Sequence, residues 1–188
     1  IRENLKLRRF ALVEGTAVSY IHGGGSVGVL VSFDTNVADN DEFVAMGKNI
    51  AMQVAAMNPE YLSKEDISDE ELAKMKSITI DSALNKPDSL PVPILNSLTE
   101  EAISSKKWSD EDSTIYQGLD KKQRKNFVNF ISKEAYAILA EIAVSHKAEI
   151  VENKIFGGLV QGRLAKQIKE VSLLEQDFVR SDLFEGNV

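Results

Sequence analysis

The sequence predicts an α+β protein, in which a small antiparallel β-hairpin is packed by helices and followed by a much longer helical region. Two β-rich runs separated by a cluster of glycines predict the hairpin. Apolar residues at intervals of three and four, behind residues that cap helices, predict the helices that follow. No internal repeat or low-complexity tract interrupts this order.

The hairpin is the first predicted element. Its strands, at about residues 17–22 and 27–33, are rich in Val, Tyr, Ile and Leu, and residues 23–26, Gly-Gly-Gly-Ser, supply the turn. In the second strand only Gly28 and Ser32 separate the apolar side chains. Both faces of this strand are therefore expected to be covered, and it is expected to have a neighbour on each side.

Two helices are predicted after the hairpin. The first, at about residues 40–57, has acidic and cap-competent residues before one apolar stripe, and an Asn-Pro pair ends it. The second, at about residues 68–84, begins with Ser68 and Glu71, the spacing of a capping box. By contrast, the segment before the hairpin, residues 5–14, is compatible with either a helix or a strand.

The middle of the chain is more polar. Residues 91–93, Pro-Val-Pro, are expected to form a short extended connector. Short helices are expected at residues 97–106 and 109–117, on either side of Trp108.

Two further helical patterns complete the chain. An apolar stripe behind a cap at Asp120 predicts a helix over residues 120–146. An amphipathic pattern over residues 148–171 contains Gly157 and Gly158, which are expected to kink the helix or divide it in two.

Composition narrows the class of protein. The 188 residues are 43% hydrophobic and 27% charged, as in globular proteins, and the net charge of −7 argues against a nucleic-acid partner. The sequence has no cysteine, which excludes disulfides, thiolate metal sites and a cysteine nucleophile. No apolar run approaches the roughly 18 to 20 residues of a membrane span, so a cytoplasmic protein with no membrane contact is expected.

The sequence contains few candidates for nucleotide-binding, metal-binding or catalytic motifs. The glycine-rich run lacks the Lys and Ser or Thr of a P-loop and precedes a strand, so it is interpreted as a turn. The two histidines, His22 and His146, lie far apart without ligand-spaced carboxylates, and no nucleophile with its partners is present. The basic run 121–125 is interpreted as a solvated helix face. These observations favour a binding protein without cofactor or metal, and not an enzyme.

Three blocks of sequence resemble the elongation factor Ts family and occur in its order. They are IRENLKLRRF at 1–10 with SYIHGG at 19–24 and GVLV at 28–31, then IAMQVAAMNPEYL at 50–62, and finally GRL at 162–164 with EVSLLEQDFV at 170–179. Together they cover about half of the chain, at its two ends.

The resemblance implies a guanine-nucleotide exchange factor that binds elongation factor Tu and promotes GDP release in translation elongation. It places Ile1, Arg2, His22 and Gly23 against the GTPase. Because an exchange factor needs only a higher affinity for the nucleotide-free GTPase than for its GDP form, no catalytic side chain is required.

The resemblance also implies a domain organisation. Residues 1–15 match the tail of a first core subdomain, and residues 16–62 with 159–188 match a discontinuous second core subdomain. Residues 63–158 would then form an enlarged, inserted helical arm of antiparallel, coiled-coil type. An alternative interpretation is a helical interaction module on the same core, with a homodimer formed through the arm.

The sequence departs from the family at several points. The family usually has glycine at the position of Arg2, and its T-D-F-V motif is not found in this sequence. The family's N-terminal helical domain and C-terminal strand have no counterpart here either. The chain is therefore expected to be a piece of a longer protein, with weak or no exchange activity by itself.

Overall fold

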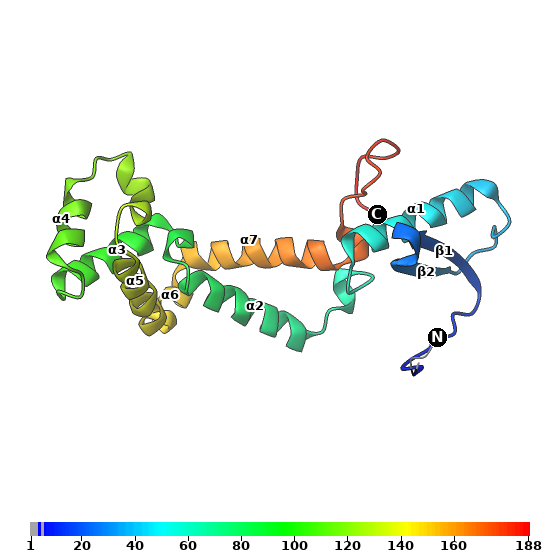
Figure 1. Ribbon diagram of the computed structural model, residues 1–188, viewed down its shortest axis with the longest axis horizontal. Helices are drawn as coiled ribbons and strands as arrows, with labels where there is room; N and C mark the ends of the chain where they lie inside the picture. Colours follow the sequence, from blue (N-terminus) through cyan, green and yellow to red (C-terminus); the bar gives the residue numbers. More distant parts are fainter. Residues whose placement is uncertain (1–3, 5) are drawn as a thin grey trace. The chain divides into compact units, whose positions relative to one another are not determined.

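The computed structural model describes residue 4 and residues 6–188. The chain divides into two units, of which unit 1 comprises residues up to Asp66 together with Ile168–Val188, and unit 2 comprises Ile67–Gln167. Unit 1 contains the β-hairpin, and unit 2 contains helices, so the α+β class is confirmed (Figure 1).

The hairpin of unit 1 pairs β1 (Thr16–His22) with β2 (Val27–Phe33) in antiparallel register, from Thr16 opposite Phe33 to His22 opposite Val27. Both strands lie where the sequence predicts them. Side chains on one face, including Val18, are covered, as alternation in an antiparallel strand requires.

Helix α1 (Asp41–Met57) covers this face of the hairpin. The Asn40 side chain caps it by accepting hydrogen bonds from the backbone N–H groups of Glu42 and Phe43. Phe43 packs edge-to-face on Phe33 with ring centroids 5.2 Å apart. The helix predicted at residues 40–57 is confirmed.

The outer face of β2 is exposed, contrary to the expectation that both faces of this strand are covered. Val27 is 40% exposed and Leu30 is 52% exposed. Among the residues that the structure describes, β1 is the only strand paired with β2. The prediction that both faces of β2 are covered and both edges paired is therefore wrong for this part of the chain, because no second layer packs on its outer face.

Unit 2 is built from helices. The capping box at Ser68 and Glu71 is formed and opens α2 (Asp69–Leu84), as the sequence predicts. The other helices are α3 (Val92–Ser104), α4 (Asp110–Gly118), α5 (Lys133–Ser145), α6 (Lys147–Glu152) and α7 (Lys154–Val171), whose last residues belong to unit 1. The two short helices predicted on either side of Trp108 correspond to α3 and α4.

The core of unit 2 gathers side chains from all of these helices. At its centre Phe127 packs against Tyr116 with ring centroids 4.9 Å apart, and Trp108 lies edge-to-face on Tyr116 at 6.1 Å. The Trp108 indole N–H donates to the Ala135 carbonyl, which satisfies its buried polar group. Because the core draws on several helices, the long antiparallel coiled coil expected for the arm is not confirmed.

Two local predictions for unit 2 need correction. Residues 91–93 do not form an extended connector, since α3 begins at Val92 and Pro93 lies in its first turn, where the missing N–H costs nothing. Gly157 and Gly158 lie within α7 and do not interrupt it. The break falls at Asn153, whose side chain accepts the N–H of Ile155 and so caps α7.

The prediction of one continuous helix over residues 120–146 needs correction as well, because this segment is interrupted. The Asp120 side chain accepts the N–H of Gln123, which begins a 3-10 segment, Gln123–Asn129, in which Asn126 has a non-helical φ of −129°. Phe127 is thereby buried in the core, and a new helix, α5, starts behind the cap Ser132. Burial of one aromatic side chain overrides the helical pattern here.

Candidate partner-binding surface

The end of the hairpin in unit 1 carries two of the residues singled out from the sequence. His22 is the last residue of β1 and is exposed, and Gly23 opens the turn that follows. The other two, Ile1 and Arg2, lie outside the described residues.

Tyr20 fixes the orientation of His22. Two residues apart on β1, the two side chains point to the same side of the hairpin, and the Tyr20 hydroxyl lies 2.9 Å from His22 Nδ1. When Nδ1 accepts this hydrogen bond, Nε2 carries the proton and remains available as a donor at the surface.

The turn requires glycine at its first position. Gly23, Gly24 and Gly25 have φ of +58°, +65° and +100°, in the region that favours glycine. A Cβ on Gly23 would lie 2.5 Å from the Ser26 hydroxyl, which donates to the His22 carbonyl. The backbone at Gly23 is thus bare, and another molecule can approach it closely.

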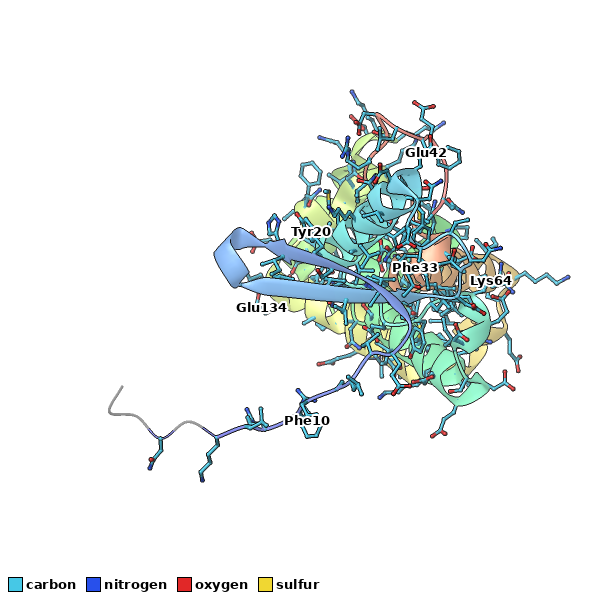
Figure 2. All side chains as sticks on the ribbon, turned by 90° about the vertical axis from the view of Figure 1, so that its right-hand side faces the viewer. Phe10, Tyr20, Phe33, Glu42, Lys64 and Glu134 are labelled. Atoms are coloured by element: carbon cyan, nitrogen blue, oxygen red, sulfur yellow. The ribbon has the colours of Figure 1, made fainter. Side chains whose placement is uncertain are left out.

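A pocket of about 340 Å³ lies beside His22. Its walls come from three separate parts of unit 1, namely Tyr20 and His22 on β1, Met52, Ala55 and Ala56 on α1, and Val179 and Arg180 near the C-terminus. Small side chains on α1 make the hollow. We refer to this pocket, together with His22 and Gly23, as the hairpin shoulder; Figure 2 shows Tyr20 on the hairpin.

The charge at the hairpin shoulder is limited. The Arg180 guanidinium pairs with both carboxylate oxygens of Asp182, at 2.8 and 2.7 Å. Arg180 is partly buried and Asp182 is exposed, and the remaining wall of the pocket is mainly apolar. The hairpin shoulder can therefore receive an apolar side chain beside one histidine and one paired arginine.

Sequence reasoning from the residues alone did not identify the pocket-lining side chains on α1 and at the C-terminus. The resemblance to the family did contain a signal for these side chains, however, because the pocket is lined by residues from all three matched sequence blocks. Tyr20 and His22 belong to the first block, Met52, Ala55 and Ala56 to the second, and Val179 to the third. Contacts between distant segments are set by tertiary packing, which no local pattern encodes.

Further exposed apolar side chains occur on the extended segment before the hairpin. Leu7, Phe10 and Leu12 are between 80% and 87% exposed. Figure 2 shows Phe10 on this extended segment, away from Tyr20. Across the described ranges, no helix is long and apolar enough to cross a bilayer, and no cluster of three metal-ligating side chains occurs.

These features define an α+β protein in which a hairpin unit, assembled from both ends of the chain, is interrupted by a helical unit with its own core. The chain belongs to the elongation factor Ts family, since the family model Elongation factor TS matches residues 1–184. It is therefore related to translation elongation factors.

Individual relatives agree with this assignment. The elongation factor Ts of Clostridioides difficile is 32% identical over 183 residues, which cover 96% of this chain and 39% of the relative. That of Hydrogenobaculum sp. is 35% identical over 130 residues, 69% of this chain and 44% of the relative. That of Syntrophotalea carbinolica is 40% identical over 100 residues. The chain matches less than half the length of these relatives.

Proposed function

We propose that this chain is part of a guanine-nucleotide exchange factor that binds elongation factor Tu and promotes GDP release during translation elongation. The observation that carries the proposal is that three sequence blocks, shared with the family and distant along the chain, meet at the hairpin shoulder. A surface assembled in this way is suited to one specific partner.

In this proposal the hairpin shoulder meets the GTPase through His22 and Gly23, and Ile1 and Arg2 also contact the GTPase. His22 offers an oriented donor and Gly23 a bare backbone, next to a pocket for an apolar side chain. The protein acts without a catalytic group or cofactor, and it acts in the cytoplasm. It binds the nucleotide-free GTPase more tightly than the GDP form. By linkage, bound GDP weakens the binding of the exchange factor by the same factor by which the exchange factor weakens the binding of GDP.

The domain organisation follows the same proposal. Residues 16–62 with 159–188 serve as the second core subdomain, and residues 63–158 serve as the enlarged inserted arm. Support comes from the contact pattern, because unit 1 is likewise assembled from both ends of the chain.

Differential binding tests the proposal directly. Affinity of the chain is measured by biolayer interferometry for elongation factor Tu in its nucleotide-free and GDP-bound forms, and stopped-flow release of a fluorescent GDP analogue is measured with the longer protein. We expect tighter binding to the nucleotide-free form, and faster release with the longer protein than with this chain. Equal affinity for both forms, or no acceleration by the longer protein, would reject exchange activity.

A second candidate function is a helical interaction module centred on unit 2. The observation that favours it is the separate core of unit 2, to which none of the described residues of unit 1 contributes. Binding of a partner or a second copy that survives loss of the hairpin shoulder would support this alternative.

A further inference from the structure

Unit 2 contains a groove of about 370 Å³ between α3 and the region where α5 meets α6. This volume lies within the range of roughly 300 to 1,000 Å³ that is usual for ligand pockets. The floor of the groove is apolar, since Ile94, Leu98 and Ile150 line it and belong to the core of unit 2. Because these side chains are packed in the core, the shape of the floor is set before any partner binds.

The rim of the groove is acidic and incompletely neutralised. It carries Glu101 and Glu149, and no lysine or arginine is among the described residues that line the groove. His146 Nε2 lies 2.9 Å from Glu101 and its Nδ1 lies 3.5 Å from Glu149, but a neutral imidazole has one N–H and can donate to only one of them. Lys107 lies 3.7 Å from Glu101. Two carboxylates therefore face one ammonium group, and the Glu149 side chain, 84% exposed, is open to a cation from another molecule.

Further negative charge lies on the two helices that form the groove. Glu100 is next to Glu101 on α3, and Glu152 is the last residue of α6. Both are exposed, and in the described part of the chain neither has a basic side chain within 4.0 Å. The surface around the groove therefore attracts cations and repels acidic partners.

We propose that the groove binds a short basic segment of another protein, in which one apolar side chain lies between lysine or arginine residues. The apolar side chain lies on the floor of Ile94, Leu98 and Ile150, and the cationic groups pair with Glu101 and Glu149 on the rim. Charge complementarity favours this occupant over an acidic or an uncharged one. The apolar floor favours a peptide over a small amine, because a peptide presents both kinds of side chain.

This interaction goes beyond nucleotide exchange and does not depend on it. The groove lies in unit 2, whereas the proposed contact with elongation factor Tu is the hairpin shoulder in unit 1. The inserted helical unit thereby acquires a partner of its own. Because binding to elongation factor Tu is measured separately, failure of either proposal leaves the other standing.

Defined peptides test the groove on the full chain. The probe is the fluorescein-labelled peptide GSRKLKRSG, whose binding is followed by fluorescence anisotropy at low salt. Two matched peptides separate the contributions of the floor and the rim: GSRKGKRSG keeps the positive charge without the apolar side chain, and GSEELEESG keeps the leucine with the opposite charge. We expect the probe to bind about tenfold or more tightly than either matched peptide, and its affinity to fall as salt is raised.

A blocking substitution locates the binding. Ser97 lines the groove from an exposed position on α3, so Ser97→Trp fills the groove without changing the core and should abolish binding of the probe. Asn96→Trp is the matched control, because Asn96 is the preceding residue on α3, is also exposed and does not line the groove. This control should bind the probe like the unmodified chain.

Removal of the rim charges tests the electrostatic contribution. Glu101→Gln with Glu149→Gln should weaken binding of the probe about tenfold. Glu70→Gln with Glu134→Gln, at two exposed positions that do not line the groove, changes the net charge equally and should have little effect. Glu149→Gln alone, at a highly exposed position, should weaken binding about twofold to fivefold and repeats the test if the double variant melts early.

Several outcomes overturn the proposal. They are no binding of the probe at low salt, binding that survives both the blocking substitution and the loss of the rim charges, and equal binding of the peptide without leucine. Displacement of the probe by an equal concentration of spermidine would identify the groove as a site for small amines instead. An affinity for the probe that rises on dilution of the chain would show that another copy of the chain covers the groove.

Discussion

Gln53 on α1 and Gln176 near the C-terminus are joined by a buried hydrogen bond of 3.0 Å between Gln53 Nε2 and Gln176 Oε1. Gln53 Nε2 also donates to the Asp177 carbonyl, and Gln53 Oε1 accepts the N–H of Val179 at 2.8 Å. Both glutamine side chains are almost completely buried. One side chain on α1 thus holds the C-terminal segment, and with it the Val179 wall of the hairpin shoulder.

Replacing Gln53 by Leu should destabilise unit 1 by about 2 to 3 kcal/mol, because it leaves the buried Gln176 carbonyl unpaired and removes two partly buried hydrogen bonds to the backbone of Asp177 and Val179. Urea unfolding of the full chain measures the change in free energy. The matched control is Gln161→Leu at an exposed position on α7, where we expect less than about 0.5 kcal/mol. A Gln53→Leu chain as stable as the unmodified one would contradict this role.

This network shows what the sequence could not reveal. Strong local signals, such as the Ser68 capping box and the strands on either side of the glycine turn, predicted their elements correctly. Gln53, however, occupies an interior position on a helix whose polar residues normally face solvent. Only its partner, 123 residues away in sequence, makes its burial favourable.

The incorrect predictions also result from contacts between residues that are distant in sequence. The stripe over residues 120–146 was read as one helix, but the core of unit 2 draws in Phe127 and breaks it. The candidate site was predicted in part, since His22 and Gly23 lie together at the end of the hairpin, whereas the pocket beside them depends on contacts between α1 and the C-terminal segment.

Gly47 should not tolerate alanine, although alanine favours helices. A Cβ there would lie 2.8 Å from Val18 Cγ2 and 3.3 Å from the Phe33 ring, so α1 would have to move off the hairpin. We expect a net destabilisation of about 1 to 3 kcal/mol. Gly158→Ala on α7 meets no atom within 4 Å and should stabilise unit 2 by about 0.5 to 1 kcal/mol.

Chemical denaturation followed by circular dichroism checks both glycine substitutions. The comparison is informative because the two changes are identical in chemistry and both are made within α-helices. Equal stabilisation by Gly47→Ala and Gly158→Ala would show that α1 does not pack closely on the hairpin.

Asp112 should make the stability of unit 2 depend on pH. Its carboxylate accepts the N–H and the hydroxyl of Ser132, which caps α5, and the hydroxyl of Ser109, which caps α4. Burial alone would raise the pKa of Asp112, but these three hydrogen bonds outweigh it and lower the pKa below its usual value. One carboxylate therefore stabilises the N-termini of two helices.

A lowered folded-state pKa means that the contribution of Asp112 is present above its unfolded pKa, about 3.9, and is lost as pH falls through the folded value. Asp112→Asn should cost about 1 to 3 kcal/mol at neutral pH. The difference from the unmodified chain should shrink below about pH 4. Urea unfolding across pH measures it, with exposed Asp110→Asn as control; a difference that does not vary with pH would contradict the charged network.

Substitution of His22 tests whether the hairpin shoulder contacts the GTPase. If the proposed contact with elongation factor Tu is correct, His22→Ala should weaken binding by about 1 kcal/mol, or roughly fivefold, as expected of an interface side chain outside the strongest contacts. Tyr20→Phe removes the hydroxyl that orients the imidazole and keeps the ring. It should therefore reduce affinity by a smaller factor.

Isothermal titration against nucleotide-free elongation factor Tu measures both effects. His146→Ala provides the matched control, because it removes the other histidine of the chain from a groove in unit 2 that the proposed contact does not use. His22 is exposed at the end of a strand, so its loss should leave the melting temperature unchanged and any loss of affinity can be assigned to the contact. Equal affinities for His22→Ala and the unmodified chain would place His22 outside the interface, as an exposed residue at the end of β1.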